Sequence, residues 1–192
     1  MTTEKLKATD TVSSGLICNP KAGEAAQATG LFEIKCHDKD GNLKWEAQSK
    51  NLVVNVGLAY MAGSALTSVA AITSWYIGLY GAGASNTPAA ADTMSSHAGW
   101  TEVVAYSNVT RVAATFATAT TANPSVATNS ASPAVFNING TTTVGGAFLT
   151  SGSAKSGTAG TLFSAADFGS PGDRSVVNSD TLSVTYTFSL AG

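Results

Sequence analysis

Charged side chains are scarce in most of this 192-residue chain. From residue 52 to residue 192 only eight residues carry a charge, whereas residues 1–51 hold seven basic and seven acidic side chains. The eight are Asp92, Glu102, Arg111, Lys155, Asp167, Asp173, Arg174 and Asp180. A freely soluble monomer normally keeps itself dispersed with a mixed charged surface. The composition therefore predicts that much of the exterior packs against copies of the chain or a larger body, which favours an assembly component over an enzyme.

The chain also lacks a cluster of basic residues, and its formal net charge is −2. Nucleic acids and anionic membrane surfaces both require a basic patch on the protein, so we expect neither as a partner. The most helical apolar piece, residues 52–66, is interrupted by two glycines and two small polar residues and is too short to cross a bilayer.

No apolar run follows Met1, so we expect no secretion signal and folding in the cytoplasm. There are only two cysteines, Cys18 and Cys36. In a reducing compartment such cysteines are more often small buried apolar groups than a disulfide, and we expect free thiols here.

One cluster of possible metal ligands surrounds the first histidine. His37 stands beside Cys36 and Asp38, with Asp40 close by. On an alternating strand Cys36 and His37 point to opposite faces, and no second Cys/His pair completes a zinc site. The run from Asp38 to Asn42 also lacks the later acidic ligand of a calcium loop. We interpret it as a polar hairpin turn and predict no metal and no cofactor.

A second cluster, ADTMSSHAGWTE at residues 91–102, places serines beside His97. It contains no Gly-x-Ser-x-Gly elbow, and a chain rich in serine places some serine near a histidine by chance. We expect Asp92 to cap a helical turn over residues 93–98 and Trp100 to be a buried anchor. No catalytic residue is predicted, and the protein is not expected to be an enzyme.

Short alternating segments predict the fold. Residues 31–36 and 43–47 alternate apolar with polar side chains on either side of an Asp-Lys-Asp-Gly-Asn turn, which predicts a β-hairpin. Residues 51–66 have the spacing of one short helix. Further strands are expected at residues 74–80, 101–106, 111–119, 135–139, 142–149, 161–163, 175–177 and 181–190. The pattern predicts a mainly β protein, an antiparallel sandwich of jelly-roll or Greek-key type. We expect five aromatic side chains to be largely buried: Trp45, Trp75, Trp100, Phe148 and Phe188.

The N-terminal residues 1–29 have no hydrophobic period and hold Pro20 in their middle. We expect an extended arm that becomes ordered only on a partner, followed by one β-domain over residues 30–192. Four larger apolar residues are spaced along the arm as though to dock into a partner's groove: Leu6, Val12, Leu16 and Ile17.

Several segments together resemble a known group of proteins. They are DKDGNLKWEAQSKNLVVNVGL, SWYIGLYGAG, ADTMSSHAGWTEVVAYS, NSASPAVFNI, GGAFLTS, KSGTAGTLF and GDRSVVNSDTLSVTYTF, within residues 30–190. This set resembles a family of tailed-bacteriophage virion proteins, of the decoration or cement sort that binds the capsid exterior. The arm lies outside the resemblance.

The resemblance implies a non-enzymatic protein of the virion surface, made in the host cytoplasm, whose partners are the major capsid protein and copies of itself, trimer before dimer. Such a protein would bridge neighbouring capsid subunits and stabilise the shell, with Leu6, Val12, Leu16 and Ile17 as candidate capsid contacts. Two alternatives stay open. Similar sequences are also described as tail or fibre components, which would bind a host receptor, and a glycan or peptidoglycan hydrolase would need a pair of carboxylates in a groove.

Overall fold

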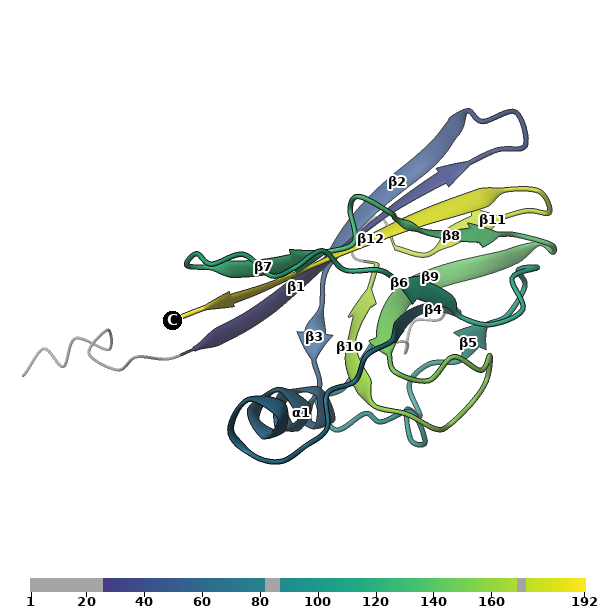
Figure 1. Cartoon of the computed structure of the whole chain (residues 1–192). Coiled ribbons are helices and arrows are strands. Elements are labelled where there is room, and N and C mark those ends of the chain that lie inside the picture. The colour runs from purple at the N-terminus through teal and green to yellow at the C-terminus, as the bar shows by residue number, and fades with distance from the viewer. Residues whose placement is uncertain (1–25, 82–86, 169–171) are drawn as a thin grey trace, which may run out of the picture.

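Two antiparallel β-sheets pack face to face with one helix beside them (Figure 1). The computed structural model describes residues 26–81, 87–168 and 172–192. The predicted β-sandwich is confirmed; the jelly-roll connectivity stays a prediction.

The first sheet has the strand order β2-β1-β12-β7, and β8 also pairs with β12. Its members are β1 (Gln27–His37), β2 (Leu43–Lys50), β7 (Ser125–Thr128), β8 (Ala134–Asn137) and β12 (Thr181–Ala191). The second sheet has the order β3-β10-β9-β4-β5, with β11 paired to β9 and β6 to β4. Its members are β3 (Leu52–Val53), β4 (Trp75–Gly81), β5 (Glu102–Val103), β6 (Val112–Ala114), β9 (Thr142–Thr150), β10 (Leu162–Asp167) and β11 (Arg174–Val176). Helix α1 spans Asn55–Leu66.

The core lies between the two sheets and follows the alternation of the longest strands. Phe32, Ile34 and Cys36 of β1 are fully buried. In register with them, β12 buries Leu182, Val184 and Tyr186, and the rings of Phe32 and Tyr186 lie 4.5 Å apart. A shift of one residue would turn every one of these side chains to the other face, so the burial pattern fixes the register.

The predicted hairpin is confirmed, with β1 and β2 joined by a tight polar turn. Asp38 Oδ1 accepts backbone N–H bonds from Asp40 and Asn42, both at 2.9 Å. Gly41 has φ +83, a conformation that favours glycine. The pKa of Asp38 is lowered, chiefly by the backbone hydrogen bond from Asn42. Its carboxylate thus holds the turn.

Several element boundaries differ from the predictions. The helix begins at Asn55 rather than residue 51, because Leu52 and Val53 pair with β10 as β3. Residues 93–98 form turns closed by a bridge between Thr93 and Ser96 and not a helical turn. The strand predicted over 101–106 shortens to β5, and β7 was not predicted.

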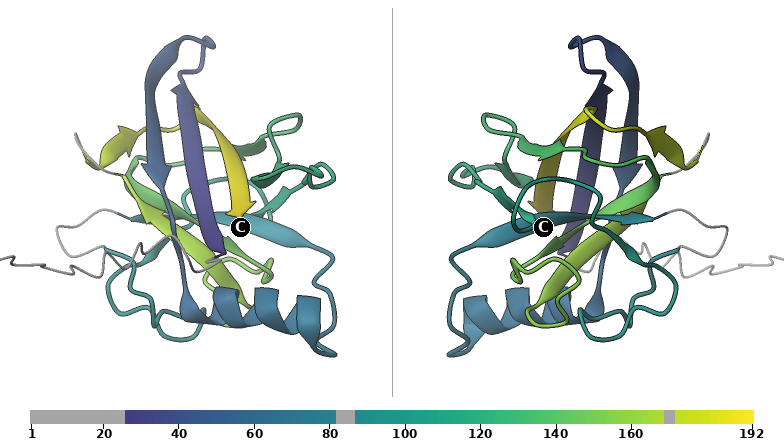
Figure 2. Two further views of the ribbon diagram at one scale, coloured as in Figure 1. Left: turned by 90° about the vertical axis from the view of Figure 1, so that its left-hand side faces the viewer. Right: turned by 90° about the vertical axis from the view of Figure 1, so that its right-hand side faces the viewer.

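The long strands β1 and β12 continue past the edge of the second sheet. Their last pairs, Gly30↔Phe188 through Gln27↔Ala191, join β7 in a narrow projecting ribbon that ends at the C-terminus (Figures 1 and 2). The strand begins at Gln27, so residues 27–29, expected in the arm, belong to β1. The rest of the predicted arm up to residue 25 lies outside the described residues.

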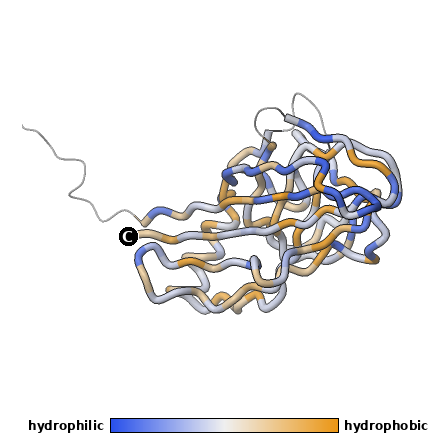
Figure 3. Tube along the Cα trace, turned by 90° about the horizontal axis from the view of Figure 1, so that it is seen from above, coloured by the Kyte–Doolittle hydropathy of each residue, from blue (hydrophilic) through white to orange (hydrophobic). Residues whose placement is uncertain are grey.

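Of the five aromatic residues expected in the core, Trp100 and Phe148 are buried. Trp45, Trp75 and Phe188 are partly buried and pack against the edge of the core. They lie where the cover is incomplete: Trp45 on edge strand β2, and the other two at an opening between the sheets. Hydrophilic residues gather toward the hairpin end, away from the C-terminus (Figure 3).

Candidate functional site

The few charged residues after residue 51 are largely withdrawn from the surface. Of the eight, only Asp173 is exposed; the other seven are buried or partly buried. A protein normally leaves its charged side chains in water and buries them only when they are paired. The exterior formed by this part of the chain therefore carries few exposed charges, fewer than the composition suggested.

Two deeply buried charges form one ion pair. Arg111 is 1% exposed and Glu102 6%. The guanidinium donates to both carboxylate oxygens, Nε to Oε1 at 2.9 Å and Nη2 to Oε2 at 2.7 Å. It also donates to the carbonyls of Gly152 and Gly157, at 2.8 and 2.9 Å. The fork geometry satisfies both partners. This pair fastens the loop after β9 to the body of the sandwich.

Lys155 lies in the same loop and strengthens its attachment. Its Nζ donates to the carbonyl of Tyr106 at 2.6 Å and lies 3.9 Å from the centre of the Tyr106 ring. Desolvation lowers the pKa of Lys155, and burial raises that of Tyr106. Lys155 thus anchors the loop to Tyr106 through a hydrogen bond to a backbone carbonyl.

A second buried acid joins the turn before β12 to the hairpin. Asp180 Oδ2 accepts from Lys44 Nζ at 2.5 Å and from the backbone N–H of Val177 at 2.8 Å. Cys36 Sγ lies 3.8 Å from the same oxygen. Burial, followed by the nearby Asp180 charge, raises the pKa of the Cys36 thiol to about 11. The thiol is free, as expected, and stays protonated at neutral pH.

We expect Cys36 to be chemically silent in the folded protein. A Cys18→Ser variant keeps Cys36 as its single thiol. Because the thiolate is the reactive form and this thiol is buried, the folded variant should not react with a thiol reagent at pH 8, and should react fully in denaturant. Rapid labelling without denaturant would contradict the buried position.

Around the second histidine, the side chains anchor a loop and do not assemble a nucleophile. Asp92 Oδ2 accepts from Trp100 Nε1 and from the Ala89 N–H, both at 3.0 Å. Asp92 therefore does not cap a helix over 93–98, and the predicted cap is wrong, while the buried anchor at Trp100 is confirmed. The His97 ring stacks on Trp100 at 3.8 Å, and its Nδ1 lies 2.9 Å from the Trp100 carbonyl.

Helix α1 is an apolar element with little cover. It buries only Gly57 and Gly63. Leu58 is 45% exposed and Leu66 85%, and residues 51–91 contain no charged side chain. Surface helices of soluble proteins carry polar residues on the outer face, and a helix that is apolar all round is normally buried. The outer side of α1 therefore has the character of a contact surface.

Gly57 shows how closely this helix lies on the sheet. A Cβ atom at this position would lie 2.3 Å from the backbone oxygen of Phe163 in β10. We expect Gly57→Ala to destabilise the fold by about 1–3 kcal/mol through overpacking, although alanine normally favours a helix. Ser64→Ala, at an exposed position of the same helix, is the control and should change stability little. Urea unfolding measures both; a stabilised Gly57→Ala would contradict the close contact.

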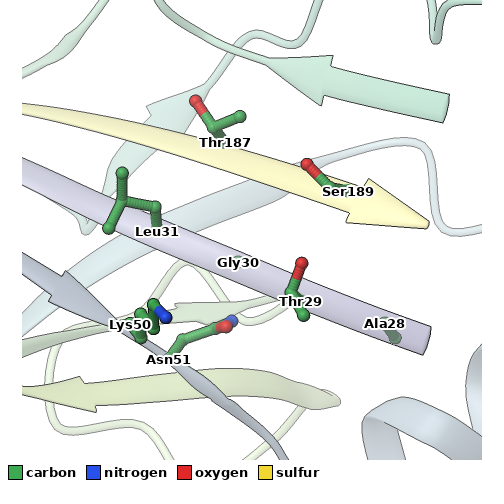
Figure 4. Close-up of a pocket in the computed structure, with 8 residues that line it drawn as sticks. All are labelled: Ala28, Thr29, Gly30, Leu31, Lys50, Asn51, Thr187 and Ser189. Atoms are coloured by element: carbon green, nitrogen blue, oxygen red, sulfur yellow. The ribbon is translucent and has the colours of Figure 1, made fainter. Parts of the chain in front are cut away.

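The projecting ribbon has an open edge beside a shallow hollow. Residues 27–29 pair with β12 on one side, whereas on the other side Gly30 accepts a hydrogen bond from the Asn51 N–H and the pairing with β2 begins at Leu31. The hollow has a volume of about 350 Å3 and lies where β2 ends at Lys50 and Asn51 (Figure 4). An unpaired strand edge is a template for pairing with another chain.

On the inner side of the ribbon lies an apolar opening, here named the aromatic mouth. It measures about 180 Å3 and is lined by Tyr60, Met61, Trp75, Phe116, Ala127, Leu149, Phe163, Tyr186 and Phe188. Helix α1 supplies Tyr60 and Met61 on one side, and the ribbon supplies Ala127 and Phe188 on the other. Its lining has no charged residue and nearly no polar group, so it suits apolar side chains rather than a polar substrate.

Within the described ranges, no three His, Cys, Asp or Glu side chains converge on a point that could hold a metal ion. None of the described helices is long and apolar enough to span a bilayer.

The candidate capsid contacts Leu6, Val12, Leu16 and Ile17 lie outside the described residues. The sequence did not predict the exposed apolar side of α1 or the aromatic mouth. The absence of charged residues from 51 to 91 could have indicated the apolar side of α1.

Comparison with known proteins gave no match: no family model fits the chain, and neither the curated proteins nor the solved structures contain a similar one.

Proposed function

We propose that this protein is a non-enzymatic structural component of a tailed-phage virion, which binds the outside of the capsid and stabilises the shell. The observation that carries the proposal is the sparsely charged exterior after residue 51, where Asp173 alone among eight charged residues is exposed and the others are buried or partly buried. The resemblance of residues 30–190 to decoration and cement proteins supports the same conclusion. The candidate partners are the major capsid protein and further copies of this chain.

The sparsely charged surface also fits the way in which such a protein would work. Each copy would cover apolar area on neighbouring capsid subunits, and burial of apolar surface contributes roughly 25 cal/mol per Å2. Association entropy offsets much of that gain for a single copy. Many copies on one lattice would together resist the pressure of packaged DNA. The rigid anchors at Arg111 and Asp180 would keep the contact surface in shape.

The apolar side of α1 is the part of the surface that we assign to contact with a neighbour. Leu58 and Leu66 are exposed on it, and Val69, 48% exposed, follows directly. Closed point-group symmetry is the usual form of a homo-oligomer. We expect copies of the chain to meet as trimers, with dimers as the second possibility, at least on the capsid lattice.

Two charges placed on this helix should strongly weaken attachment to the capsid. The double variant Leu58→Glu/Leu66→Glu puts two carboxylates on the exposed side of α1 without touching the core. We expect at least a tenfold loss of binding, which corresponds to about 1.4 kcal/mol, in co-sedimentation with full capsids that lack tails. Circular dichroism should be unchanged.

Leu43→Glu is the matched control, because Leu43 is 53% exposed on the hairpin beside Lys44. This variant should bind capsids as the unmodified protein does. If the double variant and the control bound capsids equally well, α1 would not be part of the surface that contacts the capsid.

A further inference from the structure

The aromatic mouth is an apolar surface without an occupant among the described residues. Phe188 and Trp75 on its two sides are only partly buried, and no charged residue lines it. The inner face of the ribbon continues outward from Phe188 through Leu190, which is 41% exposed. Such a surface is covered in the working protein by other apolar groups.

The chain itself contains a segment of matching character. Residues 11–20, TVSSGLICNP, are the uncharged part of the N-terminal region, between Asp10 and Lys21. They include three branched apolar side chains, Val12, Leu16 and Ile17. We propose that residues 11–20 of one copy fill the aromatic mouth of a second copy. This inference rests on the self-association that forms part of the proposed function.

The direction of β1 favours docking of residues 11–20 into the mouth of a second copy over docking into the mouth of the same chain. Pairing with β12 extends to Gln27↔Ala191, so the chain enters the ribbon from its outer tip. The three residues directly before the strand, Glu24-Ala25-Ala26, include none of the residue types that favour a turn, and the nearest such residue is Gly23. Six residues, 21–26, separate the segment from β1 and span about 20 Å when extended. The segment would therefore reach outward to a neighbour whose mouth lies within that distance of the tip.

The place of the mouth agrees with this arrangement. One of its lips is α1, through Tyr60 and Met61, and the outer side of the same helix is the surface assigned to contact with a neighbour. Where that neighbour is a second copy of the chain, it already lies beside the mouth. The volume of about 180 Å3 also suits the segment, because apolar cavities of about 150 Å3 take up a group of the size of benzene. One or two branched side chains fit.

A disulfide trap in the full-length chain tests the proposal. Cys18 directly follows Ile17, and Cys36 is buried. Ala127→Cys places a thiol in the mouth. Val126→Cys is the matched control, because Val126 is the neighbouring residue of β7 and therefore points to the opposite face of the sheet. Concentrated protein is oxidised mildly and separated on a non-reducing gel, and circular dichroism verifies that each variant is folded.

We expect Ala127→Cys to form disulfide-linked dimers and larger species at least tenfold more efficiently than Val126→Cys. The products should disappear when Cys18→Ser is added, which excludes links between the introduced thiols of two copies, and should fall when Ile17→Asp is added. Equal yields at positions 126 and 127, or no Cys18-dependent product in a folded variant, would overturn docking in the mouth. A disulfide between Cys18 and the introduced thiol of the same chain would appear as a monomer of altered mobility. That result would show that the segment docks into its own mouth and would overturn docking into a second copy.

This experiment uses purified protein without capsids. Failure of the trap would leave capsid binding through α1 untouched, whereas a successful trap with a protein that does not bind capsids would overturn the proposed function alone. The two results are therefore distinguishable.

Discussion

Glu102→Ala should destabilise the protein by about 3–5 kcal/mol, because it leaves the charge of Arg111 buried without its partner. Arg111 is 1% exposed, so water cannot replace the lost carboxylate. The Ser156 N–H, which donates to Glu102 Oε2 at 2.7 Å, would lose its acceptor as well. Urea unfolding followed by circular dichroism measures the free energy of unfolding.

Two further variants make this result specific. Lys39→Ala removes a partner of the surface pair Lys39–Asp40, whose side chains are 72% and 62% exposed, and should cost at most about 1 kcal/mol. Adding Arg111→Met to Glu102→Ala should recover part of the lost free energy of unfolding, because the double variant no longer buries the unpaired Arg111 charge. If Glu102→Ala lowered the free energy of unfolding as little as Lys39→Ala, the buried Arg111–Glu102 pair would not hold the loop after β9 in place.

Trp100→Ala should lower the free energy of unfolding by a similar amount, about 3–5 kcal/mol, because it removes a large buried ring. Trp100 is 4% exposed and packs on Tyr80 and Phe148 with ring centres 5.3 and 4.9 Å away. The variant also removes the indole N–H that Asp92 accepts in the interior. Both effects lower the free energy of unfolding.

Trp75→Ala is the comparison for this second prediction, since Trp75 is only partly buried at the aromatic mouth. Its loss should be clearly smaller than that of Trp100→Ala in the same urea titration. Equal losses at the two positions would contradict the different burial of the two rings.

The sequence predicted those elements whose side chains alternate strictly between core and surface. Phe32, Ile34 and Cys36 in β1 are of this kind, and the same holds for the inward residues of β12. In each case a single period-two pattern determines which face is buried, so no knowledge of the partner strand is needed. Strand β7 was missed because its four residues are all partly buried and show no alternation.

The anchors could not be predicted because they depend on tertiary contacts. Arg111 meets the carbonyls of Gly152 and Gly157 from more than forty positions away, and no local pattern indicates such a contact. Asp92 was expected to cap a following helix, and it instead accepts a hydrogen bond from Trp100. The partial exposure of Trp75 likewise follows from an opening between the sheets that only the packed structure reveals.

The central claim is that the sparsely charged exterior of this protein contacts a capsid. The most direct measurement of this proposal is a quantitative mass-spectrometric comparison of full capsids lacking tails with purified tails, both from a tailed phage whose genome carries the gene for this chain. We predict that the protein is present on the tailless capsids in many copies per particle. Its presence on tails alone would favour the tail or fibre alternative, and its absence from both particles would contradict a structural role in the virion.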